Sequence, residues 1–246
     1  MPPTRPLTTG PGPAIFGNDP WQVASPATSA LHQLLSAEER TRLATIASIV
    51  RFKRGEAIYV DGAPADAVFN IIAGTVKTHK KLPDGVAHIT AFLFPGDVFG
   101  LSEGGLYESS ASAVEPVTAY RLPISALRSR LKQDATLEFH VICKLCHELR
   151  TTQRHAFLLA ERRALSKVAM FLQMIELQQN LRGNGTDDIV LAMSRSDIGD
   201  YVGMSLAAVS RAFRTLAARG IIETRQRHHV KIVDRAQFEQ LAGRSG

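Results

Sequence analysis

Residues 194–222 read SRSDIGDYVGMSLAAVSRAFRTLAARGII, and this stretch decides the fold of the C-terminal third. Ser194 followed by Asp197 is a capping-box pattern, which predicts that a helix begins there. Apolar residues follow at helical spacing until Gly203 interrupts the run. Ser205 can then cap a second helix. The stretch therefore predicts two short helices joined by a sharp turn.

Such a pair is typical of the helix-turn-helix, whose second helix lies in the major groove of DNA. The apolar positions of the predicted second helix are Val209, Phe213 and Leu216. Its other positions include Ser210, Arg211 and Arg214. An ordinary helical hairpin inside a protein core would give a similar pattern, so the flanking sequence has to decide between the two.

The length, net charge and cysteine count of the chain limit the class of protein that it can be. Its 246 residues are enough for two domains, and the formal charge of +6 favours a polyanionic partner. Two cysteines, Cys143 and Cys146, exclude a disulfide framework and indicate a reducing, cytoplasmic setting. Because no apolar run is long enough to span a bilayer, we expect no membrane partner.

The pattern of apolar residues in the N-terminal half changes twice along the sequence. Seven of the 12 prolines precede Ala27, which predicts a disordered tail over residues 1–28. A helical pattern covers Leu31 to Ile49. Short β-rich runs separated by turn signals then predict a sandwich or jelly-roll barrel. These runs are Val50–Phe52, Ala57–Val60, Ala67–Ala73, Gly74–His79, His88–Leu93, Ser112–Val114 and Thr118–Leu122.

After Pro123 the pattern is helical to about Gln179 and contains an a/d seam of nearly three heptads. The seam positions are Ile142, Leu145, Leu149, Thr152, Ala156 and Leu159. A long helix with such a seam needs a partner, and the same helix of a second subunit fits. The alternative is that the helix packs on its own barrel. Residues 161–163 are a charged hinge before a further helix over 164–181.

The C-terminal end completes a DNA-binding module. Ile189–Leu191 predicts a short strand before the helix pair. A basic turn over residues 225–229 joins two β-rich runs, which predicts a hairpin wing. Asp234 then caps a closing helix that ends near Leu241. The sequence as a whole predicts an α+β chain with a β-roll, a long helix and a winged helix-turn-helix.

This order of elements resembles the CRP/FNR family of bacterial transcription regulators over residues 30–241, and most closely its FNR/FixK branch. The motifs that carry the resemblance are FKRGE at 52–56, IIAG at 71–74, FPGDVFG at 94–100, MSRSDI at 193–198 and VSRAF at 209–213. The resemblance implies a cyclic-nucleotide-binding-like sensor domain (29–133), a dimerisation helix (134–161) and a CRP-type DNA-binding domain (162–246).

The family resemblance also implies how bases are read. Arg211 matches the arginine that donates to a guanine, and Ser210 matches a position beside it. The family usually has glutamate two residues after the cap serine, where this chain has Ala207. Because a methyl group cannot accept from cytosine N4, we expect an altered or relaxed preference at that base of a TTGA-like half-site.

The candidates for phosphate contact position the duplex and carry no sequence information. They are Arg195, Ser205, Arg214, Arg225, Arg227 and Lys231. Glu223 and Asp234 are the acidic residues between Met204 and Arg235, which supports a DNA-facing surface. Double-stranded DNA, a second copy of the chain and RNA polymerase are the expected partners. Solubility charges would be the alternative explanation for single basic residues.

The effector is less well defined. A buried cyclic phosphate needs an arginine, and residues 82–120 contain neither Lys nor Arg, so cyclic AMP is disfavoured. An iron–sulfur cluster, which usually needs four thiolates, is disfavoured because the chain has two cysteines. Haem stays open as a cofactor, with five histidines as axial candidates: His79, His88, His140, His147 and His155.

Cys143 and Cys146 are either small thiols of a helix or a redox sensor that forms an intersubunit disulfide or an oxidised thiol.

We find no P-loop, no dinucleotide loop, no metal-spaced cluster and no catalytic residue set, so an enzyme is not expected. The sequence predicts a homodimeric regulator that binds a palindromic operator. The alternative is a ligand-binding module, sensing a cyclic nucleotide, haem or redox state, that does not bind DNA.

Overall fold

The computed structural model of the chain describes residues 45–82, 85–181, 188–226 and 228–243. The predicted tail and most of the predicted helix Leu31–Ile49 lie outside these residues. The last five residues of that helix were predicted wrongly, because residues 45–47 are not helical and Ser48 and Ile49 belong to strand β1 (Ser48–Phe52). In β1 these two residues pair with β8, where Ser48 lies opposite Arg121 and Ile49 opposite Tyr120.

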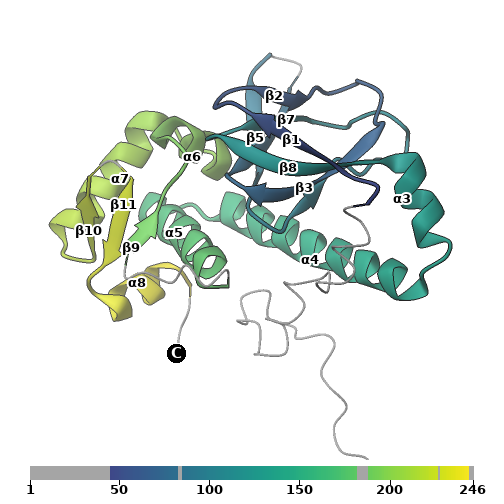
Figure 1. Cartoon of the computed structure of the whole chain (residues 1–246). Helices are drawn as coiled ribbons and strands as arrows, with labels where there is room; N and C mark the ends of the chain where they lie inside the picture. Colours follow the sequence, from purple (N-terminus) through teal and green to yellow (C-terminus); the bar gives the residue numbers. More distant parts are fainter. Residues whose placement is uncertain (1–44, 83–84, 182–187, 227, 244–246) are drawn as a thin grey trace, which may run out of the picture.

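The N-terminal half is a roll of two four-stranded antiparallel sheets, in the orders β1-β8-β3-β6 and β2-β7-β4-β5 (Figure 1). Its remaining strands are β2 (Ala57–Tyr59), β3 (Ala67–Ala73), β4 (Val76–Lys81), β5 (Ala87–Leu93), β6 (Val98–Phe99), β7 (Ser110–Ala113) and β8 (Val117–Pro123). Seven of the eight strands match predicted β-rich runs within a few residues. The sequence analysis missed β6, because a two-residue strand is too short to show a period.

Aromatic side chains fill the interior between the two sheets. Tyr107 is 5% exposed, and its ring stacks on Tyr59 at a centroid distance of 3.9 Å. Phe69 and Phe99 stack at 5.4 Å, and Tyr59 lies about 6 Å from each of them. The Tyr107 hydroxyl donates to the carbonyl of Ala67 at 2.8 Å. The roll therefore has an apolar, densely packed centre.

Three helices follow the roll: α3 (Ile124–Leu131), α4 (Ala135–Ala160) and α5 (Ala164–Leu181). Figure 1 shows α4 running along the roll from α3 toward the C-terminal domain. Lys144 anchors α4 to the roll, since its Nζ lies 2.9 Å from Asp97. It also lies 3.2 Å from Glu148 of the same helix. The predicted break between the two helices is confirmed, because Glu161 ends α4 with extended backbone and α5 begins at Ala164.

The C-terminal domain contains β9 (Asp188–Val190), α6 (Arg195–Val202), α7 (Leu206–Ala218), β10 (Ile222–Arg225), β11 (His229–Ile232) and α8 (Arg235–Leu241). The three strands form a sheet in the order β10-β11-β9, which confirms the predicted hairpin wing. Asp234 caps α8 as predicted, because its side chain accepts from the backbone N–H of Gln237. None of the helices in the described ranges is long and apolar enough to cross a membrane.

One continuous core joins the roll to the C-terminal domain. Phe92 of β5 lies edge-on to Phe171 of α5 at 6.2 Å and tilted toward Tyr201 of α6 at 5.2 Å. Helix α6 is therefore packed between the roll and α5. The α+β class and the order of roll, long helix and winged helix-turn-helix are confirmed, whereas the exact domain boundaries stay predictions.

Candidate nucleic-acid interface

The capping box that begins α6 is present in full. Ser194 Oγ accepts from the backbone N–H of Asp197 at 3.1 Å, and Asp197 Oδ2 accepts from the N–H of Ser194 at 3.1 Å. The other carboxylate oxygen of Asp197 lies 2.5 Å from Lys77 Nζ on β4. Burial alone would raise the pKa of Asp197, but hydrogen bonds from Lys77 and Ser194 outweigh it and hold that pKa below its usual value. Asp197 therefore caps the N-terminus of α6 and also connects this helix to the roll through Lys77.

The turn between α6 and α7 depends on one glycine at its start and on another inside α6. Gly203 ends α6 in the left-handed conformation, with φ of 66°. At Gly199 a Cβ atom would lie 2.6 Å from the carbonyl oxygen of Met204, closer than atoms can approach. A side chain at Gly199 would therefore push the turn away from α6. The sharp angle between the helices depends on both positions.

The last carbonyl groups of α6 are satisfied by side chains from other helices. His155 of α4 places Nε2 at 2.7 Å from the carbonyl oxygen of Tyr201, and Lys167 of α5 donates to the carbonyl of Val202 at 2.8 Å. Free carbonyls at a helix C-terminus need such partners when they are buried. The sequence analysis named His155 as a haem candidate and did not find this role, because the bonded residues are 35 or more positions apart.

Helix α7 presents a polar face and buries an apolar one. Val209, Ala212, Phe213 and Leu216 are buried, which confirms the three predicted apolar positions. Ala207, Arg211 and Arg214 are exposed at spacings of four and three, and Ser210 is half-buried beside them. Ser205 caps the helix, because its Oγ accepts from the N–H of Ala208 at 3.2 Å. The base-reading candidates therefore lie together on the outer side of α7.

The phosphate candidates differ in their surroundings. Arg214 is exposed on α7, and Lys231 is half-buried on β11. Arg225 forms ion pairs with Glu223 at 3.0 Å and Asp188 at 3.7 Å. Arg227 lies outside the described residues.

Arg195 is held against the helix pair. Its guanidinium lies 3.3 Å from the centre of the Phe213 ring, and burial lowers its pKa to about 10. Its buried Nη1 has no hydrogen-bond partner among the described residues. The guanidinium of Arg195 therefore packs α6 on α7.

The seam of α4 is exposed in the single chain. Ile142, Leu145, Leu149 and Leu159 are each 45–60% exposed, and Thr152 and Ala156 between them are exposed as well. Large apolar side chains on one face of a helix are typical of a protein–protein interface.

Cys143 is half-buried and Cys146 is exposed, and neither is in a disulfide. Within the described residues, no group of His, Cys, Asp or Glu side chains is placed to hold a metal ion.

This geometry defines a winged helix-turn-helix protein whose C-terminal domain is packed on a β-roll domain. Residues 49–134 match the model of the cyclic nucleotide-binding domain family, and residues 166–241 match the Crp-like helix-turn-helix domain. The chain is 30% identical over 212 residues to the nitrogen fixation regulation protein FixK of Azorhizobium caulinodans, covering 84% of this chain and 86% of FixK.

Two further comparisons agree. The transcriptional activator protein anr of Pseudomonas aeruginosa is 31% identical over 193 residues, or 78% of this chain and 79% of that protein. The structure of FixK2 from Bradyrhizobium japonicum is 30% identical and superposes with a TM-score of 0.74, covering 82% of this chain and all of that one. The chain belongs to the CRP/FNR family, and it is a DNA-binding transcription regulator.

Proposed function

We propose that the chain works as a homodimer that is held together by the seam of α4. Four large aliphatic side chains exposed on one helix face support this, since burying them against a second copy removes apolar area from water. A two-fold axis along α4 presents two copies of α7 to one duplex. In the helix-turn-helix class such copies are about 34 Å apart, which is one turn of DNA. The expected operator is therefore an inverted repeat.

In this proposal α7 enters the major groove and three residues read bases. Arg211 donates two hydrogen bonds to a guanine, because its planar guanidinium matches the O6 and N7 acceptors. Ser210 contacts the neighbouring base, and Ala207 offers a methyl-sized contact where the family usually has glutamate. The observation that carries the proposal is the common exposed face of Ala207, Arg211 and Arg214 on α7.

The remaining basic groups contact phosphates. Ser205 and Arg214 are exposed at the cap and on the outer face of α7, and Arg225 and Lys231 belong to the wing strands β10 and β11. Arg227, between these two in the sequence, is a further candidate. Arg195, at the N-terminus of α6, is the sixth candidate for a phosphate contact. RNA polymerase is the further partner, because a regulator of transcription acts through it.

We also propose that the roll does not take cyclic AMP in the usual way. Its centre is filled by the stack of Tyr59 and Tyr107, and residues 82–120 bring no cation to a phosphate. Titration calorimetry with cyclic AMP should give no saturable heat.

Haem binding and the redox chemistry of Cys143 and Cys146 are separate candidates for the signal that the chain senses. They are tested by absorbance after reconstitution with haem and by the redox response of a variant with both cysteines changed to serine.

The central test is selection of operators from random DNA by the purified chain, followed by gel shift at several salt concentrations. The proposal expects an inverted repeat, with discrimination relaxed at the base that faces Ala207. It also expects a log–log salt slope of roughly −0.9 for each phosphate contacted. Recovery of no sequence above random competitor would contradict the proposal.

A further inference from the structure

The hairpin of β4 and β5 has two faces that contact different domains. Val76 pairs with Leu93, and both side chains are buried in the core of the roll. The neighbouring residues Lys77 and Phe92 also lie opposite each other, and a strand turns successive side chains to opposite faces. Phe92 is buried in the core that the roll shares with the C-terminal domain. The C-terminal domain therefore packs against the outer face of this hairpin.

Helix α6 meets that outer face through an apolar contact and a charged one. The ring of Phe92 lies 5.2 Å from the ring of Tyr201, near the C-terminal end of α6. Lys77 reaches Asp197 in the first turn of the helix, with 2.5 Å between Nζ and Oδ1. The two charged side chains are 28% and 17% exposed, so salt screens their attraction less than that of an open surface pair. The roll therefore contacts both ends of α6.

The carboxylate of Asp197 joins this contact to the start of the helix-turn-helix. Its Oδ2 accepts from the backbone N–H and from the hydroxyl of Ser194, at 3.1 and 2.7 Å, while its Oδ1 faces Lys77. Because these hydrogen bonds fix the orientation of the carboxylate, the attraction of Lys77 acts on the first turn of α6 and not on a freely moving side chain. The ion pair therefore holds the helix itself against the roll.

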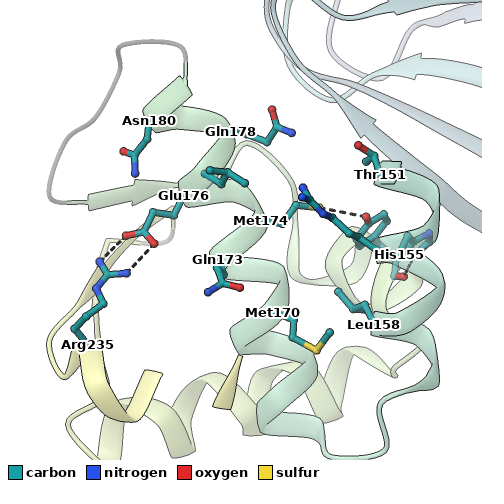
Figure 2. Close-up of a pocket in the computed structure, with 13 residues that line it drawn as sticks. Thr151, His155, Leu158, Met170, Gln173, Met174, Glu176, Gln178, Asn180 and Arg235 are labelled. Carbon is teal, nitrogen blue, oxygen red and sulfur yellow. Dashed lines mark hydrogen bonds and ion pairs between the residues drawn. The ribbon is translucent and has the colours of Figure 1, made fainter. Parts of the chain in front are cut away.

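The dimer helix and α5 also hold the C-terminal end of α6. His155 and Lys167 bind the backbone carbonyl oxygens of Tyr201 and Val202. Figure 2 shows His155 at the edge of a cavity of about 340 Å³ between α4, α5, α6 and α8. Since this end of α6 borders a cavity, its position depends on directed hydrogen bonds as well as on close packing. At the other end of the helix, Lys77 supplies the directed contact.

This docked arrangement leaves α7 free to contact DNA. Ala207, Arg211 and Arg214 are exposed while α6 is held on the roll. Figure 1 shows α7 on the side of α6 that faces away from the roll. Docking does not hide the base-reading face, which favours a role in presenting α7 over a role in blocking it.

Two copies of α7 have to reach the two half-sites of one operator together. Once the first copy is bound, the second binds at an effective concentration that depends on how narrowly its position is defined. A domain held on the roll keeps the distance between the two copies constant, whereas a domain that swings loses that freedom when it binds. A contact that fixes the domain therefore affects DNA with two half-sites and leaves binding to a single half-site unchanged.

We propose that Lys77 is a positioning residue that sets the spacing at which the protein accepts two half-sites, through its ion pair with Asp197 and without touching DNA. The inference deepens the proposed function, since it rests on a homodimer that binds an inverted repeat. It assigns part of the operator specificity to a residue of the roll, outside the domain that contacts the bases.

The test measures the affinity of the full chain for three kinds of DNA. The first is the selected inverted repeat, the second has base pairs added or removed between the half-sites, and the third keeps one half-site and randomises the other. Lys77→Met removes the charge and Lys77→Arg keeps it. Lys81→Met removes an exposed charge from the same strand and is the matched control. Asp197→Asn removes the other charge of the pair and keeps an oxygen acceptor for the cap.

Lys77→Met should bind the inverted repeat at least about fivefold more weakly than wild type, because the second copy of α7 loses its fixed position. It should bind the single half-site as wild type does, which also shows that the variant is folded. Its preference among spacings should be flatter, with an unchanged salt slope. Lys77→Arg and Lys81→Met should behave like wild type. Asp197→Asn should behave like Lys77→Met, and combining these two changes should add no further loss.

The inference fails, while the proposed function stands, on any of three results. One is a Lys77→Met protein that keeps the affinity and the spacing preference of wild type. Another is an equal loss on the single half-site with a salt slope reduced by roughly 0.9, which would make Lys77 a phosphate contact. The third is additive losses for Lys77→Met and Asp197→Asn, because independent residues give additive effects. A wild type that prefers no inverted repeat to a single half-site would overturn both the proposed function and the inference.

Discussion

His155 of α4 and Tyr201 of α6 stack face to face, with ring centroids 3.9 Å apart and planes within 4°. The same histidine donates from Nε2 to the backbone carbonyl of Tyr201 at 2.7 Å, because a carbonyl oxygen can only accept. One side chain therefore fixes both the ring and the backbone at the end of the first helix of the DNA-binding pair. The helix that we propose as the dimer seam is coupled in this way to the elements that read DNA.

This contact predicts a pH dependence of stability. Burial and the nearby Lys167 lower the pKa of His155 from its usual 6.5, so the unfolded chain binds more protons as the pH falls below 6.5. The stabilisation by neutral His155 is therefore complete at higher pH and is lost toward acid. His155→Gln should be less stable than wild type at about pH 8, and the difference should narrow by about pH 5.5.

Chemical denaturation of both proteins at the two pH values measures this difference. His79 has a pKa lowered by burial and by Lys77 and Lys81, so the wild type alone cannot isolate His155. A difference between wild type and His155→Gln that stays constant with pH would contradict the prediction.

Two arginines of α7 should respond differently to substitution. Arg211→Lys should cost about 1–3 kcal/mol on the selected operator and relax preference at one base pair, because an ammonium cannot donate in a fork. Arg214→Gln should weaken binding evenly across sequences and reduce the salt slope by roughly 0.9. Gel shifts with matched and mismatched operators at several salt concentrations separate the two effects. Equal behaviour of the two variants would remove the distinction between base and phosphate contact.

Ala207 offers a gain-of-specificity experiment. Ala207→Glu should introduce a preference for cytosine at the base that it faces, since a carboxylate accepts from cytosine N4. Ala218→Glu adds the same charge at an exposed position near the other end of α7 and serves as the control. Operator selection with the three proteins gives the measurement. An unchanged profile for Ala207→Glu would place this residue away from the base edges.

The seam can be broken by one charge. Leu145→Glu should give a monomer and lose specific operator binding, because burying an unpaired carboxylate between two helices is prohibitive. Val60→Glu changes a side chain of similar exposure on the roll, 52% against 48%, and should remain a dimer. Light scattering and gel shift report the two properties. Tight operator binding by a monomeric Leu145→Glu protein would refute the coupling of dimerisation to DNA binding.

The aromatic stack in the roll should be worth measurable stability. Tyr59→Ala removes a stacked ring and should destabilise the chain by about 3–5 kcal/mol. Tyr107→Phe keeps the ring and loses the hydrogen bond to Ala67, which should cost about 1 kcal/mol. Neither variant should gain affinity for cyclic AMP, because residues 82–120 still contain no Lys or Arg to bind the phosphate. Denaturation curves and calorimetry test both statements, and a saturable heat with cyclic AMP would show that the tyrosines alone had blocked the site.

Much of the fold could be predicted from local patterns. The capping box at Ser194 and Asp197, the glycine turn and the buried positions of α7 depend on neighbours within a few residues, so their spacing is visible in the chain. The seven matched strands were found in the same way, from their composition and turn signals. Strand β6 was missed because two residues cannot display a period.

The sequence by itself determined the class of the protein: the elements, their order and the basic helix-turn-helix follow from periodicity, caps and motif spacing. Only the tertiary structure decided how these elements are connected. Lys77 meets Asp197 across 120 positions, His155 meets Tyr201 across 46, and the cavity beside Tyr201 is built from four helices. Such contacts depend on how the helices and the roll pack together, and no local pattern records which distant side chains that packing brings within a few ångströms.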